Sequence, residues 1–215
     1  MSFSFGHIPL TGDFQGLLIA LINNKRPDDG CVNVTMAKSD ALALADDLPS
    51  IQSYLVDVAR CYKRYHSKTA RECVRLKASL KSVSATVHDL LASRSWIQLK
   101  KTFEMYKLMF GHDFDADISK DFDHWYSKAL SSIYQYAVNP NLYFAQALER
   151  DVEWCQKEVS WGYAYGVARV FTWRSEIDLG DIAEAFKNEY KKTLSEQVKL
   201  YVSGYAKKVL LQILQ

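Results

Sequence analysis

A six-residue motif occurs twice in the sequence, and this internal similarity constrains the fold more than any other feature of the chain. Residues 94–99 read R-S-W-I-Q-L, and residues 174–179 read R-S-E-I-D-L. Each copy follows an apolar stretch with helical spacing and precedes an amphipathic stretch that ends in an aromatic residue. Self-similarity of this kind is typical of repeat architectures, in which successive units bury their apolar faces against one another.

A second pair of similar segments occurs in the same order. Residues 11–22 read T-G-D-F-Q-G-L-L-I-A-L-I, and residues 203–214 read S-G-Y-A-K-K-V-L-L-Q-I-L. In both segments a turn of small residues leads into an apolar helix. Residues 124–138 have the matching helical pattern without the small residues before it. Two motifs that recur in one order favour true repeats over chance similarity between amphipathic helices.

The apolar residues of the chain have the spacing of α-helices, with charged residues on the opposite face. Two such stripes are formed by Leu99, Phe103, Tyr106 and Phe110, and by Leu179, Ile182, Phe186 and Tyr190. The chain has 9 glycines and 4 prolines, too few for the frequent turns of an all-β sandwich or barrel. No segment of useful length alternates with period two. We therefore predict an all-α fold.

Turn-forming residues divide the chain at three places. The stretch K-R-P-D-D-G ends at Gly30, L-P-S occupies residues 48–50, and N-P-N occupies residues 139–141. Together with the repeated motifs, these breaks predict the last helix of one unit followed by two fuller units. The predicted domains are residues 1–30, residues 31–139 with an inserted basic segment at about 49–80, and residues 140–215.

Composition restricts the class and the compartment. The net charge is +2, which excludes a nucleic-acid binder as an overall class, so any basic function must be local. The longest apolar run is residues 17–22, far shorter than the roughly 18 residues that span a bilayer, and the N-terminus lacks a signal-peptide pattern. The cysteines have no C-x-x-C spacing, which is typical of free thiols in a reducing cytosol. We predict a cytoplasmic protein with peripheral membrane contacts.

Several separated motifs resemble the annexin family, and they occur in the family's order. Residues 167–194, together with the later S-G and V-L-L-Q-I-L, resemble a fourth annexin repeat. Residues 11–22 resemble the end of a second repeat, and S-R-S-W-I-Q-L-K-K-T-F at residues 93–103 resembles helices B and C of a third. The stretch N-P-N-L-Y-F-A-Q-A-L at residues 139–148 resembles plant annexins in particular. The resemblance implies repeats of about five helices, here called A to E.

The resemblance also implies calcium-dependent binding to phospholipid. In the family, a G-x-G-T loop between helices A and B supplies backbone carbonyls, and an acidic residue farther along the repeat caps the ion. Calcium takes roughly six to eight oxygen ligands, and glycine lets the loop turn tightly. In repeat four the two glycine positions fall at Val159 and Trp161, the threonine position at Gly162 and the acidic position at Tyr201. We therefore expect this calcium site to be lost.

Repeat three retains one calcium ligand candidate, Asp121. The glycine positions of this repeat fall near Ser79 and Lys81, and the Lys81 ammonium would repel the ion. Asp121 occupies the acidic position, whereas the corresponding position at the end of repeat two is Pro9. The alternative role of Asp121 is that of a helix N-cap or a solvated acid. Calcium binding is thus predicted to be weakened or lost.

Three alternating acids, Asp113, Asp115 and Asp117, look like the start of a calcium loop. They lack the following glycine and the terminal glutamate of an EF-hand. We expect them instead to complement the N-terminus of a short helix near Ile118.

The segment at about 49–80 is an insertion relative to the annexin pattern, and it is strongly basic. Glu72 is the single acid between residues 60 and 81. A basic amphipathic helix can lie on an anionic membrane. The alternatives are binding to an acidic nucleic-acid or protein surface, and a solvated helix packed on its own domain. The predicted membrane-binding residues are Lys63, Arg64, Lys68 and Arg71.

Trp161 is a further membrane-binding candidate, because it falls in the loop where annexin repeats meet lipid. An exposed tryptophan there would lie at the level of the headgroups. Packing in the core, beside Tyr163 and Tyr165, is the alternative.

The sequence contains no recognisable enzyme motif, and we predict that the protein is not an enzyme. The five histidines form no H-E-x-x-H or triad-like signature, and there is no G-x-x-x-x-G-K-[ST] loop. A D-x-x-G nucleotide motif, which the resemblance would place before Gly204, has Tyr201 in place of its aspartate. We predict that Arg94 and Arg174, at the ends of helix B, bind backbone carbonyls of neighbouring loops.

The resemblance therefore implies an annexin-like peripheral phospholipid-binding protein with degraded calcium loops, whose partner is an anionic membrane surface. The alternative is an annexin-fold structural or protein-interaction module that binds no lipid. In the family, repeat four packs on repeat one. A chain without repeat one would expose apolar surface, so we also expect a homo-oligomer. No nucleic-acid partner is expected.

Overall fold

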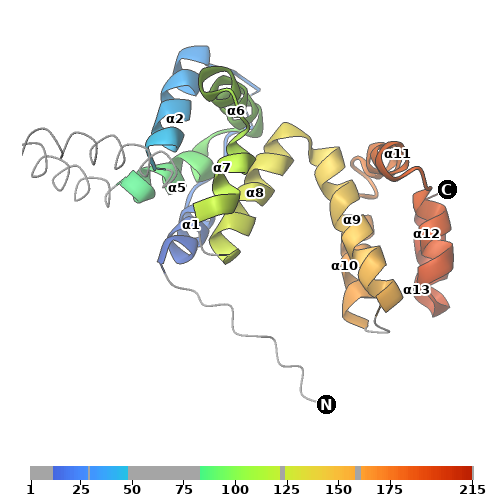
Figure 1. Cartoon of the computed structure of the whole chain (residues 1–215). Coiled ribbons are helices and arrows are strands. Elements are labelled where there is room, and N and C mark those ends of the chain that lie inside the picture. Colours follow the sequence, from blue (N-terminus) through green and yellow to red (C-terminus); the bar gives the residue numbers. More distant parts are fainter. Residues whose placement is uncertain (1–11, 29, 48–82, 122–123, 158–160, 215) are drawn as a thin grey trace, which may run out of the picture. The chain divides into compact units, whose positions relative to one another are not determined.

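The computed structural model describes residues 12–28, 30–47, 83–121, 124–157 and 161–214 (Figure 1). Within these ranges all regular secondary structure is helical, which confirms the all-α prediction. The helices are α1 Gly12–Asn23, α2 Val34–Asp47, α5 Val83–Ser93, α6 Trp96–Phe110, α7 Phe114–Asp121, α8 His124–Val138, α9 Pro140–Lys157, α10 Trp161–Arg174, α11 Leu179–Tyr190, α12 Leu194–Tyr201 and α13 Gly204–Ile213.

The chain divides into two compact units, Met1–Val138 and Asn139–Gln215, which are called unit 1 and unit 2 below. The local sequence explains why a new helix begins at this division. The side-chain oxygen of Asn139 accepts a hydrogen bond from the backbone N–H of Leu142 at 3.1 Å, as an N-cap residue does. Pro140 follows at the first position of α9, where its missing N–H costs no helical hydrogen bond.

The two units contain corresponding series of helices, which confirms the predicted repeat structure. Phe114 at the start of α7 corresponds to Leu194 at the start of α12, and His124 at the start of α8 corresponds to Gly204 at the start of α13. These pairs have a constant separation of 80 positions, which is also the separation of the two R-S-x-I-x-L motifs. In this correspondence α2 and α5 to α8 match α9 to α13, and α1 precedes both series.

Unit 1 is built around one apolar core. α2 packs along α6, and α1 packs along α5. The stripe predicted on α6 is confirmed, because Leu99, Phe103 and Tyr106 are buried and Phe110 packs against the core. Burial of one such side chain contributes about 1.5–3 kcal/mol, so the repeated apolar spacing is what assembles the helices.

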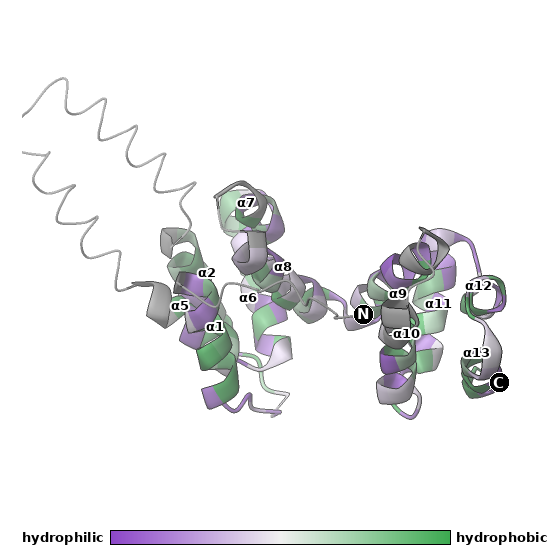
Figure 2. Ribbon diagram, turned by 90° about the horizontal axis from the view of Figure 1, so that it is seen from below, coloured by the Kyte–Doolittle hydropathy of each residue, from purple (hydrophilic) through white to green (hydrophobic). Residues whose placement is uncertain are grey.

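Unit 2 has a separate core formed by α9 to α13. The second predicted stripe is also confirmed, because Leu179, Ile182 and Phe186 are buried and Tyr190 packs at the edge. α9 is the central element, since it packs against α10, α11 and α12. Figure 2 shows polar and apolar residues alternating along the helices of both units, as expected for amphipathic helices.

Arg94 and Arg174 bind carboxylates, where the sequence analysis predicted backbone carbonyls. The Arg94 guanidinium donates two hydrogen bonds to Asp40, at 2.8 and 3.1 Å, and so ties α5 to α2. Arg174 donates two hydrogen bonds to Asp178. A guanidinium matches a carboxylate with two parallel charge-assisted hydrogen bonds, which are stronger than bonds to a neutral carbonyl. The nearby aspartates therefore take these partners.

Carbonyls at the end of α5 are bound instead by Arg26, from the segment between α1 and α2. The Arg26 guanidinium donates to the backbone oxygen of Leu91 at 2.6 Å and to that of Arg94. It also lies 3.8 Å from the centre of the Trp96 ring. A cation at a helix C-terminus satisfies free carbonyls, so Arg26 fixes this connecting segment on unit 1.

Candidate calcium and membrane site

The predicted calcium position of unit 1 lies largely outside the described residues. The side chain of Asp121, the last residue of α7, is among those that the structure does not describe. The connection between α2 and α5 falls in residues 48–82, which are also not described. The candidates in that segment are Lys63, Arg64, Lys68, Arg71, Ser79 and Lys81. All of these roles stay predictions.

The corresponding position in unit 2 is partly described. α9 ends at Lys157 and α10 begins at Trp161, so Trp161 is the first residue of a helix and not a residue of the loop where the sequence analysis placed it. Val159 and the side chain of Trp161 lie outside the described residues. Tyr201, at the family's acidic position, ends α12.

The described donors of unit 2 do not fit a calcium ion. Tyr201 offers a phenol where the family's site has a carboxylate, and calcium prefers charged and carbonyl oxygens. Gly162 lies in the first turn of α10, where a carbonyl accepts a bond within the helix. Across the part of the chain that the structure describes, no group of three or more His, Cys, Asp or Glu is placed to hold a metal ion.

Two acids at the start of α7, Asp113 and Asp117, bind side-chain partners that were not predicted from the sequence. The Asp117 carboxylate accepts a hydrogen bond from the Tyr106 hydroxyl at 2.6 Å and lies 2.9 Å from Nδ1 of His112. Asp113 accepts from Lys107 at 3.0 Å and from the Tyr134 hydroxyl at 3.1 Å.

The electrostatics of this network agree with its geometry. Burial, reinforced by Asp117, raises the pKa of Tyr106 well above its ordinary value. Burial, together with Asp113, raises the pKa of Tyr134 to about 12. The hydrogen bond from Lys107 lowers the pKa of Asp113. At neutral pH the tyrosines therefore stay protonated and donate to the two aspartates, and Asp115 and Asp117 lie in the first turn of α7 as predicted.

The sequence analysis missed two aromatic–lysine pairs at corresponding positions. In α8 the Lys128 ammonium lies 5.6 Å from the centre of the Trp125 ring. In α13 the Lys208 ammonium lies 5.9 Å from the centre of the Tyr205 ring. The signal was present in the sequence, since an aromatic residue is followed by a lysine three positions later in both copies.

No described helix has both the length and the apolar character that crossing a bilayer requires.

A family model described as Annexin matches residues 71–133 and 165–213, which together make up more than half of the chain. The chain belongs to the annexin family. This finding and the fold confirm the family resemblance read from the sequence, while the plant-type likeness stays a prediction.

Individual annexins match over most of this chain. Human annexin A7 is 27% identical over 203 residues, a match that covers 94% of this chain and 35% of annexin A7. The structure of annexin III aligns with a TM-score of 0.71 and 25% identity, and covers 94% of this chain and 53% of that protein. A calcium-bound structure of annexin (Sm)1 aligns with a TM-score of 0.67 and 23% identity, over 94% and 50% of the two chains. This annexin chain thus spans about half or less of the relatives that it matches.

Proposed function

We propose that this annexin is a peripheral phospholipid-binding protein, and that it binds anionic membranes with little or no dependence on calcium. Membership of the family and the retained helical frame support binding to phospholipid. The observation that carries the weakened calcium dependence is Tyr201, whose phenol replaces the carboxylate at the end of helix D in unit 2.

The proposal assigns the membrane attraction to basic and aromatic residues in place of bridging calcium. Each lysine or arginine near an anionic surface contributes about 1 kcal/mol, and a tryptophan at the headgroup level adds an interfacial anchor. Asp121 is the proposed remaining calcium ligand, in unit 1. The proposed membrane-binding residues are Lys63, Arg64, Lys68, Arg71 and Trp161.

The domain organisation follows the helix correspondence. We propose that α1 ends a repeat, that residues 31–139 form a second repeat with a basic insertion at about 49–80, and that residues 140–215 form a third. The proposed location is cytoplasmic and peripheral at membranes, and the proposed role is binding and not catalysis. Homo-oligomers are a further part of the proposal, because large apolar side chains such as Ile22 are exposed.

Sedimentation with vesicles tests this function. The full chain is mixed with vesicles of phosphatidylserine and phosphatidylcholine, in EGTA and in millimolar calcium, and with vesicles of phosphatidylcholine alone. We expect sedimentation with the anionic vesicles in both conditions. Strictly calcium-dependent sedimentation would contradict the weakened calcium dependence.

Charge reversal in the inserted segment localises the contact. The triple variant Lys63→Glu, Arg64→Glu, Lys68→Glu should lose most of its binding in EGTA. A matched triple variant, Lys100→Glu, Lys187→Glu, Lys192→Glu, changes three exposed lysines elsewhere and should bind more strongly than the first. If the wild-type chain sediments with no vesicle in either condition, lipid binding is wrong and the interaction-module alternative is favoured.

A further inference from the structure

The last helix of each unit begins with an aromatic residue that is followed three positions later by a lysine. Trp125 is the second residue of α8 and Lys128 the fifth, and Tyr205 and Lys208 hold the same places in α13. In both helices the ammonium lies within 6 Å of the ring centre, the range of a cation–π contact. We call Trp125–Lys128 and Tyr205–Lys208 the corner pairs, because each follows the corner between helices D and E.

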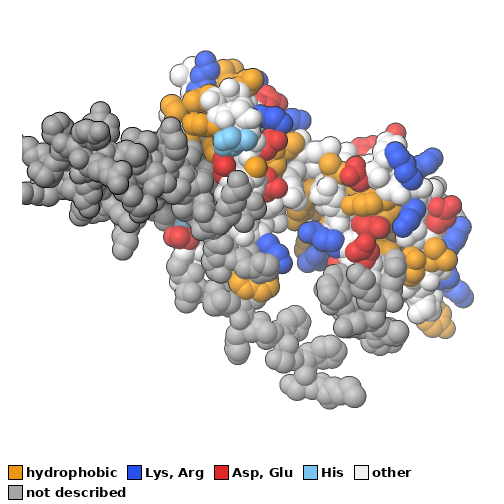
Figure 3. Space-filling model, viewed as in Figure 1, with side chains coloured by type: hydrophobic (Ala, Val, Ile, Leu, Met, Phe, Trp, Pro, Cys, Tyr) orange, Lys and Arg blue, Asp and Glu red, His pale blue; other side chains and the backbone are white. Residues whose placement is uncertain are grey.

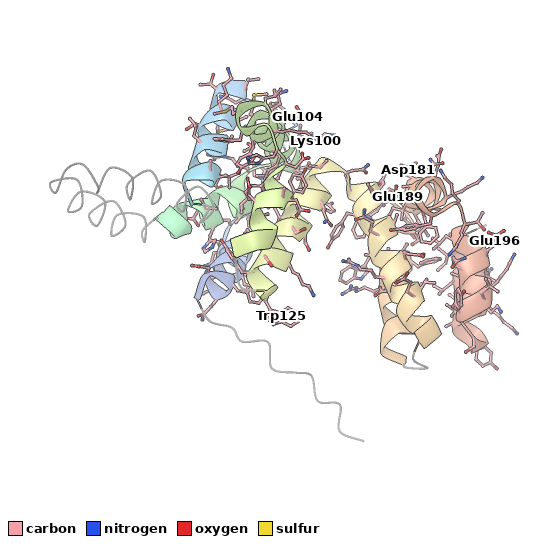
Figure 4. All side chains as sticks on the ribbon, viewed as in Figure 1. Lys100, Glu104, Trp125, Asp181, Glu189 and Glu196 are labelled. Atoms are coloured by element: carbon pink, nitrogen blue, oxygen red, sulfur yellow. The ribbon has the colours of Figure 1, made fainter. Side chains whose placement is uncertain are left out.

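The corner pairs expose aromatic rings to solvent, Tyr205 almost fully and Trp125 in part. Tyr205 is 87% exposed and Trp125 is 38% exposed. Figure 4 shows Trp125 projecting from the end of unit 1 at which α8 begins. Tryptophan and tyrosine are enriched where proteins meet the membrane–water interface, since the ring enters the headgroup layer while its polar edge stays hydrated. A lysine held against the ring adds attraction to anionic lipid.

The residues around Tyr205 are also a combination of exposed apolar and basic side chains. Leu200, at the end of α12, is 68% exposed. Lys207 donates to the backbone oxygen of Lys199 at 2.6 Å, so one more ammonium group lies at this corner and ties the start of α13 to α12. Figure 3 shows basic and hydrophobic side chains side by side over α12 and α13.

The acid of α12 offsets part of this positive charge. Glu196 lies in the first turn of α12, where its carboxylate accepts a hydrogen bond from the backbone N–H of Thr193 at 3.0 Å, and it also interacts electrostatically with Lys199. The exposed side chains of Leu200, Tyr205 and Lys208 remain at the corner, and this apolar and basic combination complements a negatively charged surface.

The corner of unit 2 lies at the same end of that unit as the connection between α9 and α10. In Figure 1 the C mark lies at the upper end of α13, so this helix begins at its lower end, and α9 and α10 are joined at the lower end as well. Trp173, which is 71% exposed with Arg169 beside its ring, lies near the end of α10 and therefore at the other end of unit 2. It provides a matched control.

We propose that the two corner pairs are calcium-independent contacts for an anionic membrane surface, in which the rings enter the headgroup layer and the lysines bind lipid phosphates or carboxylates. This inference rests on the proposed phospholipid binding and names a site for it in each unit. A membrane surface suits the pairs because each combines a solvent-exposed ring with a lysine beside it.

Two double variants test the proposal with vesicles of phosphatidylserine and phosphatidylcholine in EGTA. Each lysine near an anionic bilayer strengthens binding about fivefold, so Lys128→Ala with Lys208→Ala should weaken vesicle partitioning about 25-fold. Trp125→Ala with Tyr205→Ala should weaken it about tenfold. The single variant Tyr205→Ala is included because so exposed a side chain contributes little to the stability of the fold. Circular dichroism checks that each variant is folded.

The control Trp173→Ala removes an exposed aromatic of similar size at the other end of unit 2 and should leave partitioning within about twofold of wild type. Wild-type binding that both double variants retain would overturn the corner pairs while leaving the proposed function intact. Absence of wild-type binding would overturn both. An equal loss in Trp173→Ala and Tyr205→Ala would also contradict the site, because the effect would then not depend on position.

Discussion

The turns between helices C and D in the two units have the same backbone and different side chains. In unit 1 the C-cap residue after α6 is Gly111, with φ 79°, and in unit 2 the C-cap residue after α11 is Lys191, with φ 58°. Each of these residues donates its N–H to the carbonyl four positions earlier, at 2.9 and 3.0 Å. The next helix begins three positions later in both units. The C-cap residue with positive φ therefore specifies the same turn in both units, although the neighbouring side chains differ.

The side chains around the two turns stabilise them in different ways. In unit 1 Asp117 binds Tyr106 of the preceding helix, so the turn is held by contacts distant in sequence. In unit 2 Thr193 and Glu196 form a capping box within one turn of α12. Gln197, which corresponds to Asp117, is 4% exposed, and its side-chain oxygen has no hydrogen-bond partner among the described residues. A repeat can thus keep its backbone while exchanging a buried network for local capping.

The largest predicted change in stability is at Asp117, and the corresponding buried residue of unit 2, Gln197, should show almost none. Asp117→Ala should destabilise unit 1 by about 3 kcal/mol, because a carboxyl acceptor is lost and the Tyr106 hydroxyl stays buried without it. Gln197→Met should be near neutral, since it removes a buried acceptor that has no partner. Urea unfolding, with amide exchange resolved for each unit, measures both. Equal losses at the two positions would contradict the comparison.

Mild acid should destabilise unit 1 and leave the stability of unit 2 unchanged. His88 is buried against Tyr126 of α8, with 2.8 Å between its Nε2 and the tyrosine oxygen, and against Gly16 of α1. Burial lowers its pKa below the ordinary value, although Asp13 and Asp89 oppose the shift. The fold thus favours neutral His88, so its contribution to stability is present above about pH 6.5 and is lost as the pH falls from there through the lower folded-state pKa.

The measurement is amide exchange of α1, α5 and α8 between pH 7.5 and pH 5.5, corrected for intrinsic rates. Opening of these helices should increase at the lower pH. His88→Gln keeps a hydrogen-bonding group and should remove the pH dependence. Unit 2 has Ala168 at the corresponding position and serves as an internal reference. If the opening of these helices increases equally at low pH in His88→Gln, another group causes the acid sensitivity.

Loss of the capping box should have a moderate effect. Thr193→Ala removes the hydroxyl that accepts from the backbone N–H of Glu196 at 3.2 Å, and should cost unit 2 about 1 kcal/mol. Ser203→Ala is the control, because Ser203 precedes α13 without a side-chain capping bond and should cost about 0.3 kcal/mol or less. Thermal unfolding compares the two. A Ser203 variant as unstable as the Thr193 variant would show that the box is not the cause.

The smallest effect should have opposite signs in the two units. Lys191→Gly relieves a left-handed backbone at a residue with a Cβ atom and should stabilise unit 2 by about 0.5 kcal/mol. Gly111→Ala imposes the same strain on unit 1 and should destabilise it by about 1 kcal/mol. Chemical denaturation of both variants tests the shared turn. Destabilisation by Lys191→Gly would mean that the lysine side chain holds the turn.

The sequence was sufficient for features with a local pattern. The stripes through Phe103 and Phe186 predicted two helices and their buried faces, because helical periodicity is a property of neighbouring residues. The partner of Arg94 could not be read in this way. Asp40 lies 54 positions away, and only the packing of α2 on α5 brings it within reach of the guanidinium.

Less of the candidate site could be predicted from the sequence, for a similar reason. The proposed loss of a calcium ligand at Tyr201 needs only the sequence, because a phenol lacks the carboxylate that calcium prefers. The corner pairs need two facts that the sequence does not contain, namely that Trp125 and Tyr205 are exposed and that each lies in the first turn of a helix. The roles of Lys63, Asp121 and Trp161 remain predictions.

Arg26 has a consequence for where this protein can be cut. A fragment that starts at residue 31 would match the predicted repeat boundary, yet it would leave behind the guanidinium that binds Leu91 and Arg94 and covers the Trp96 ring. Helix B would then end in unsatisfied carbonyls beside a bare indole. The repeat boundary in the sequence and the boundary of the stably folded unit therefore differ. A stable fragment must begin before Arg26.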